Sequence, residues 1–303
     1  MREVFRTADA VDSGITADAL NWGTRKGAWS TGARGAFFTG GERVSLVDRS
    51  IAEAWVTGGT VSGGPAGELF GLDSVTAVRV DFTVPRGQSN QREGARRRDL
   101  GPDRVTVVEG VVVTSGLQTL LDLAAEVSDV VWEQVLESAL RKKLTSIAEI
   151  EAALPAMSKA RIPGVRCIRR VLALRPAGAP PTESLLETLA VQMIRSAGLP
   201  TPQRQVEVFT ADGRFVARVD LAWPELGVFL ELDGQGSQGS TGVRRREADS
   251  HRGNDWMARR SLHLATSRTQ RESDGARHRR RARAGEAPRA LTRLNNFGAR
   301  FVG

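Results

Sequence analysis

Three acidic residues lie near the ends of two strand-like stretches, FVARVDLAW (215–223) and GVFLELDG (227–234). Asp220 belongs to the first stretch, whereas Glu231 and Asp233 lie two residues apart in the second. Side chains two residues apart on a strand project to the same side. The pattern therefore predicts that the three carboxylates meet at one edge of a sheet.

A predicted helix supplies further carboxylates, because Glu183 and Glu187 are four residues apart and so share one helix face. Three or four converging carboxylates repel one another unless a hard cation neutralises them. Mg²⁺ suits such a site because it prefers oxygen ligands and phosphate substrates. The expected chemistry is phosphodiester hydrolysis, in which the metal activates water and stabilises charge on the phosphate. We expect Asp220, Glu231 and Glu187 to bind Mg²⁺ and Asp233 to assist.

A second group of candidates lies near the N-terminus. Residues 1–40 read as helix, turn, helix and a glycine-flanked hairpin, which fits a winged helix-turn-helix. Thr16 is the predicted N-cap of the second helix, and Ala17, Leu20 and Trp22 form its predicted apolar stripe. The helix and hairpin carry side chains suited to phosphates and base edges, namely Asn21, Thr24, Arg25, Lys26 and Arg34. The alternative is a solvated face without a ligand.

The elements that position these residues divide the chain of 303 residues into several parts. We predict a winged-helix unit over 1–45, a mixed α/β region over 46–125, a helical connector over 126–176, an endonuclease-like domain over 181–240 and a basic, disordered tail over 241–303. The Pro/Gly-rich stretch 175–184 reads as the linker. An arginine-rich loop at 86–104 is either solvated or tracks a phosphate backbone.

Composition limits the class of protein. No apolar run is long enough to span a membrane and no signal peptide is evident, so we expect a cytoplasmic protein without a membrane partner. The single cysteine excludes an internal disulfide framework and a cysteine-based zinc cluster. The formal net charge of +8 belongs to the tail, because residues 241–303 hold 16 arginines against 6 acidic residues. The rest of the chain is nearly neutral.

Two sets of motifs resemble known families. PPTESLLETLAVQMIRSAGLPTPQRQV and ARVDLAWPELGVFLELDG resemble the endonuclease domains related to very-short-patch-repair nucleases, which have the PD-(D/E)xK fold. VFRTADAV, GARGAFF and VTSGLQTLLDLA resemble the AbiEi-type antitoxins, whose winged-helix architecture often precedes that domain. The resemblance covers about residues 1–236. It implies DNA binding at the N-terminus, a nuclease-like C-terminal domain and a toxin partner, and it places the family's acidic positions on Glu187, Asp220, Glu231 and Asp233.

The chain departs from the nuclease pattern directly after ELDG. The family places a His or Lys there, then a helix and a strand of the type GWRVxRFTW, whereas this chain continues QGSQGSTG. Our hypothesis is that the tail is translated out of frame, since residues 242–265 read one base later can encode that helix and strand. A genuine basic arm that binds nucleic acid is the alternative. The nucleotide sequence of the gene distinguishes the two.

Together these patterns predict an α+β protein with an N-terminal winged helix-turn-helix, a mixed middle region, a helical connector and an incomplete restriction-endonuclease-like domain. Loss of the closing strand should leave an exposed sheet edge after about residue 240. The expected function is DNA binding with a C-terminal endonuclease-like domain whose activity is impaired. A non-catalytic transcriptional regulator of the AbiEi antitoxin type is the alternative.

Overall fold

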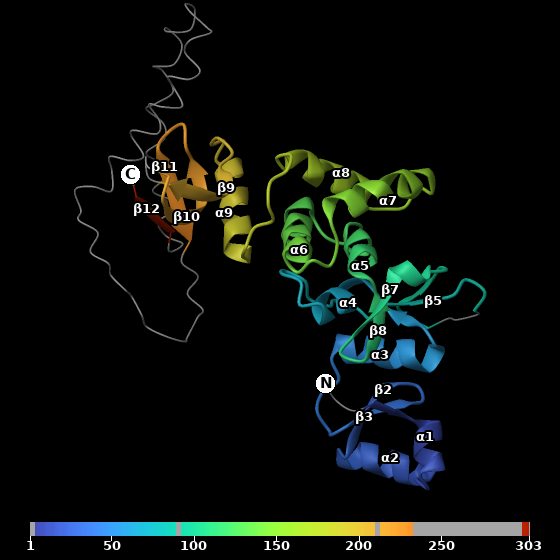
Figure 1. Cartoon of the computed structure of the whole chain (residues 1–303). Coiled ribbons are helices and arrows are strands. Elements are labelled where there is room, and N and C mark those ends of the chain that lie inside the picture. The colour runs from blue at the N-terminus through green and yellow to red at the C-terminus, as the bar shows by residue number, and fades with distance from the viewer. Residues whose placement is uncertain (1–3, 89–91, 210–212, 233–298, 303) are drawn as a thin grey trace, which may run out of the picture. The chain divides into compact units, whose positions relative to one another are not determined.

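The computed structural model describes residues 4–88, 92–209, 213–232 and 299–302. It divides into two compact units, Met1–Arg175 and Pro176–Gly303, so the division falls within the Pro/Gly-rich stretch. Helices and three separate β-sheets make up the described parts (Figure 1), which confirms the mixed α+β class. None of the helices in these ranges combines the length and the apolar character that crossing a bilayer requires.

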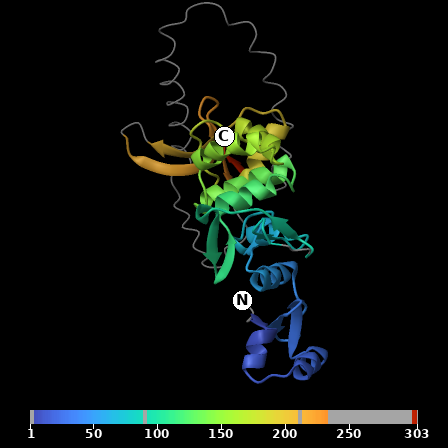
Figure 2. The ribbon, with the colours of Figure 1, turned by 90° about the vertical axis from the view of Figure 1, so that its right-hand side faces the viewer.

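The N-terminal module is a three-stranded antiparallel sheet, in the order β1-β3-β2, with two helices. Its elements are β1 (Val4–Arg6), α1 (Thr7–Asp12), α2 (Ala17–Lys26), β2 (Trp29–Ala33) and β3 (Ala36–Thr39). Figure 1 and Figure 2 show this blue module from two sides. The start of the chain was expected to be helical, but Phe5 pairs with Phe37 of β3 and stacks on its ring. Val4 and Phe5 are of the β-branched and aromatic types that are enriched in strands.

A five-stranded mixed sheet, in the order β6-β5-β4-β8-β7, forms the middle of the first unit. Its apolar core includes Val61, Phe82, Val84 and Val113, all essentially inaccessible to solvent. The elements are α3 (Leu46–Thr57), β4 (Thr60–Val61), α4 (Gly63–Leu69), β5 (Phe82–Val84), β6 (Ala95–Arg97), the 3-10 helix η1 (Pro102–Arg104), β7 (Val105–Val108), β8 (Val111–Thr114) and α5 (Gly116–Leu123).

Three further helices complete the first unit: α6 (Asp129–Arg141), α7 (Ile147–Lys159) and α8 (Val165–Leu174). Ser128 and Ser146 cap α6 and α7 through their side chains. The three helices and α5 share one core, in which Trp132, Ile150 and Ile168 are fully buried. Burying three side chains of this size contributes about 1.5–3 kcal/mol each.

The second unit places one helix on a four-stranded sheet in the order β12-β11-β10-β9. Its elements are α9 (Leu185–Ser196), β9 (Gln203–Phe209), β10 (Phe215–Trp223), β11 (Val228–Leu232) and β12 (Ala299–Val302). Val191 and Ile194 of α9 pack against Leu221 and Leu230 of the sheet. The apolar face of the helix therefore fixes where its first turn, with Glu187, lies against β9 and β10.

The expectation of an unpartnered edge at β11 is wrong for the described residues. β12 pairs antiparallel with β11, and Leu230 lies opposite Phe301. Strand pairing uses backbone groups, so an extended segment can cover an edge without a family-specific sequence. Asp233 and residues 241–298 lie outside the described residues, and the frame hypothesis for the tail therefore stays a prediction.

Candidate functional site

The first turn of α9 holds Glu187 in a fixed position. The hydroxyl of Ser184 accepts a hydrogen bond from the backbone N–H of Glu187 at 3.1 Å, which caps the helix. The Oε2 atom of Glu187 accepts from the backbone N–H of Glu183 at 3.0 Å and from Nε2 of Gln205 at 2.9 Å. Glu187 is only 4% exposed. Its carboxylate is thus buried and bound by donors from two segments of the unit.

Asp220 approaches the same region from β10. Beyond the register pair Leu221↔Leu230, its Oδ2 accepts a hydrogen bond from the backbone N–H of Leu232 at 2.8 Å. The side chain of Asp220 therefore takes the place of a backbone acceptor where β11 ends. Glu231 lies on β11, half-buried, with Arg300 of β12 as its backbone partner.

The charge of Asp220 acts on the carboxylate of Glu187. Burial raises the pKa of Glu187, and the negative charges of Asp220 and Glu183 raise it further, against the hydrogen bonds from Glu183 and Gln205 that lower it. Glu183 is balanced by Arg218, whose Nη2 lies 2.7 Å from its Oε1. Glu187 and Asp220 thus form the acidic pair of this site, and Glu183 belongs to a surface ion pair beside it.

The donor set of this pair suits Mg²⁺ in kind. Mg²⁺ is commonly held by one or two carboxylates and keeps several waters, so the predicted Mg²⁺ site needs no more carboxylates than Glu187 and Asp220 supply. Within the described residues, no group of three or more His, Cys, Asp or Glu side chains is close enough to hold a metal ion. Asp233, the fourth predicted carboxylate, lies outside those residues. The structure therefore brings together two of the four predicted positions, and Glu231 stays a candidate on the adjacent strand.

Gln205 is a site residue that the sequence analysis missed. It lies between the register pairs Val219↔Val206 and Leu221↔Arg204, and its φ is +51°. A residue with a side chain rarely adopts this left-handed conformation inside a strand. In this conformation the side chain of Gln205 donates its hydrogen bond to Glu187. No local pattern in QRQV signals such a conformation.

The predicted DNA-contacting residues lie on α2 and on the turn that joins β2 and β3. Thr16 caps α2, and Gly27 ends it in the left-handed conformation. Asn21, Arg25 and Lys26 are exposed, and their side chains make no hydrogen bond or ion pair with any part of the chain that the structure describes. Arg34 in the turn is exposed in the same way. Thr24 differs, because its hydroxyl donates to the carbonyl of Leu20 at 3.0 Å.

Trp22 is not part of an apolar stripe, which corrects the prediction for α2. Leu20 and Gly23 are the buried residues of the helix, and Trp22 is 57% exposed. The inward position is filled by Trp29 of β2, whose Nε1 donates to the carbonyl of Leu20 at 2.8 Å. The indole of Trp29 lies where a side chain on Gly23 would project. Trp22 therefore lies in solvent, on the same exposed side of α2 as Arg25 and Lys26.

The arginine-rich loop at 86–104 turns several of its side chains inward. Arg96 pairs with Asp81 and Glu126, Arg98 pairs with Asp122, and Nη1 of Arg92 lies 2.6 Å from Glu53 Oε2. Asp81 and Asp122 are themselves buried. These three arginines stabilise the fold of the first unit, so neither a solvated loop nor a phosphate-tracking loop describes them.

No protein-family model matches the chain, and no curated protein matches it either.

Proposed function

We propose that the protein binds DNA through α2 and the β2–β3 turn, in the manner of a winged helix. The observation that carries this proposal is the exposed face of α2, where Asn21, Trp22, Arg25 and Lys26 lie together without internal partners among the described residues. Residues three and four apart on a helix are neighbours on its surface. The face is therefore one contiguous patch that joins two cations, an amide and an aromatic ring.

The chemistry of this patch matches a DNA groove. Arg25 and Lys26 neutralise phosphates, and Asn21 has the amide that pairs with the edge of adenine. Arg34 in the turn would contact the backbone beside the groove, as a wing does. The resemblance of the N-terminal motifs to AbiEi-type antitoxins supports the same assignment.

The test is fluorescence anisotropy with a labelled DNA duplex at several salt concentrations. Arg25→Gln together with Lys26→Gln should weaken binding and reduce the slope of log K against log salt by about 1 for each phosphate that is no longer neutralised. Arg97→Gln is the control, because Arg97 is an exposed arginine of β6 away from α2. Equal affinity of the double variant and the control would disprove the proposed interface.

The second candidate function is Mg²⁺-dependent phosphodiester hydrolysis in the second unit. The specific observation in its favour is the raised pKa of buried Glu187 beside Asp220, since clustered carboxylates with perturbed pKa values mark functional sites. Glu187 and Asp220 would hold the ion, with Glu231 adjacent and Asp233 assisting. Bound Mg²⁺ would supply charge neutralisation at the phosphate. Gln205 would orient Glu187, and Leu232 would orient Asp220 through its backbone N–H.

A plasmid-nicking assay with Mg²⁺ tests this candidate. Asp220→Ala should abolish nicking, whereas Glu207→Ala, which removes an exposed carboxylate of β9, should not. Nicking that survives Asp220→Ala would place any activity elsewhere.

The alternative for the second unit is a non-catalytic role in a regulator of the AbiEi antitoxin type, with a toxin as partner. It draws on the structural role of Glu187, whose carboxylate accepts the N–H of Glu183 at the start of α9. DNA binding without nicking, by protein purified with intact folding, would favour this alternative.

A further inference from the structure

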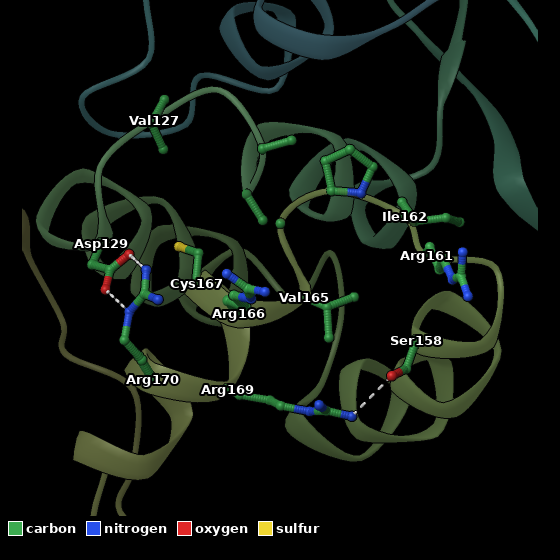
Figure 3. Close-up of a pocket in the computed structure, with 14 residues that line it drawn as sticks. Val127, Asp129, Ser158, Arg161, Ile162, Val165, Arg166, Cys167, Arg169 and Arg170 are labelled. Atoms are coloured by element: carbon green, nitrogen blue, oxygen red, sulfur yellow. Dashed lines mark hydrogen bonds and ion pairs between the residues drawn. The ribbon is translucent and has the colours of Figure 1, made fainter.

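A cavity of about 670 Å³ lies in the first unit, beside the loop that joins α7 to α8. Figure 3 shows its lining, which comes from the segment after α5, the first residue of α6, the end of α7, the loop and the first turns of α8. The volume falls within the range of small-molecule sites. The lining includes Arg161, Arg166, Arg169 and Arg170 and one acidic residue, Asp129.

The charge around this cavity is unbalanced. Nε and Nη2 of Arg170 lie 2.5 and 2.8 Å from the two carboxylate oxygens of Asp129, so this pair is neutral. Among the described residues, the side chain of Arg169 bonds only to the hydroxyl of Ser158, at 3.4 Å; Figure 3 marks this bond with a dashed line. Arg161 and Arg166 are exposed and have no ion pair with residues in the described ranges. Three of the guanidinium groups that line the cavity therefore have no carboxylate partner among the described residues.

Apart from the hydroxyl of Ser158, the rest of the wall is mostly apolar. Val127, Ile162, Pro163 and Val165 line it. Cys167 also lines it, and burial and the carboxylate of Asp129 raise the pKa of its thiol to about 12. The thiol is therefore neutral at physiological pH and adds no negative charge. The cavity joins a cationic rim to an apolar wall.

We propose that this cavity binds a small organic phosphate of nucleotide size. Guanidinium groups bind phosphate oxygens through paired, charge-assisted hydrogen bonds. Arg161, Arg166 and Arg169 would bind the phosphates, while the apolar wall would contact the organic part. Arg170 would stay on Asp129. A free small molecule suits a hollowed site with an apolar wall, whereas a DNA backbone would require only an exposed basic surface. This site is independent of the proposed α2 interface.

The test is isothermal titration calorimetry of the full chain with ADP, pyrophosphate and adenosine. ADP should bind, pyrophosphate should bind more weakly, and adenosine should not bind measurably. Arg166→Gln and Arg169→Gln should each raise the Kd for ADP roughly ten-fold or more, the effect of losing a hydrogen bond to a charged group. Both residues are exposed, so neither variant should disturb folding. Arg97→Gln serves as the matched control and should leave the Kd unchanged.

Hydrogen exchange locates the binding. ADP should slow exchange in peptides that cover residues 158–170 in the wild type and not in the Arg166→Gln and Arg169→Gln variants. The proposal is overturned if ADP does not bind, if the variants bind it as the wild type does, or if only a DNA oligonucleotide protects this segment.

Discussion

The side-chain amide of Gln205 donates a hydrogen bond to the buried carboxylate of Glu187, with 2.9 Å between Nε2 and Oε2. Gln205 does this from a left-handed backbone conformation inside β9, with φ at +51°. The hydrogen bond connects this left-handed residue of β9 to the first turn of α9. Residues held in sparsely populated conformations cluster at functional sites, which fits the acidic pair of Glu187 and Asp220.

Two substitutions of Gln205 separate the effect of its hydrogen bond from the effect of its left-handed backbone conformation. Gln205→Ala and Gln205→Gly both remove the hydrogen bond, but only Gln205→Ala keeps a Cβ at positive φ. We expect Gln205→Gly to be more stable than Gln205→Ala by about 1 kcal/mol. Hydrogen exchange of α9 and β10 peptides measures the difference as a free energy of opening. Equal opening free energies would show that the backbone is not left-handed here.

The titration of Glu187 should depend on Asp220. Burial and the charge of Asp220 raise the pKa of Glu187. A carboxyl group with a raised folded-state pKa stabilises the fold below its unfolded pKa, and this stabilisation is lost as pH rises through the folded value. Asp220→Asn removes one charge and should lower the pKa of Glu187, so that less stability is lost between the ordinary glutamate pKa and neutral pH. Side-chain carboxyl ¹³C NMR titration measures the pKa directly, and an unchanged value would contradict the proximity of the two groups.

The packing of α2 should depend on Gly23. A Cβ at this position would overlap the indole ring of Trp29, so Gly23→Ala should destabilise the N-terminal module by about 1–3 kcal/mol, the usual effect of overpacking. It should also weaken DNA binding, because Trp29 positions α2. Gly87→Ala is the control, since a Cβ there meets no atom within 4 Å. Thermal unfolding and anisotropy give the two readouts. If Gly23→Ala matches the control, Trp29 does not position the helix.

The ion pair of Asp81 and Arg96 should matter far more than a surface pair. The side chain of Asp81 is 2% exposed, and it also accepts a hydrogen bond from Ser62 Oγ at 2.7 Å. Asp81→Ala should reduce the free energy of unfolding of the first unit by about 1–3 kcal/mol, because the buried Ser62 hydroxyl loses its acceptor and Arg96 keeps only Glu126 as a partner. Asp103→Ala, which breaks the pair of 73% exposed Asp103 with Arg104, should change it by less than about 1 kcal/mol. Urea denaturation compares the two, and similar effects would argue against a buried network.

The sequence by itself determined the local elements. The predicted N-cap Thr16 begins α2, and the two strand-like stretches that carry Asp220 and Glu231 form β10 and β11. These signals are readable because helix caps and strand alternation depend on residues a few positions apart. The α+β class followed from them, as did the candidate positions of Glu187 and Asp220.

Only the tertiary structure decided which side chains meet. It placed Gln205 on Glu187, Arg96 on buried Asp81 and Trp22 in solvent, and it formed the cavity bordered by Arg166. These outcomes depend on contacts between residues far apart in the chain. In α2, they depend on Trp29 rather than Trp22 packing beside Gly23. Composition and periodicity do not encode such pairings, because the same basic residue satisfies a surface pattern whether it faces water, a carboxylate or a phosphate.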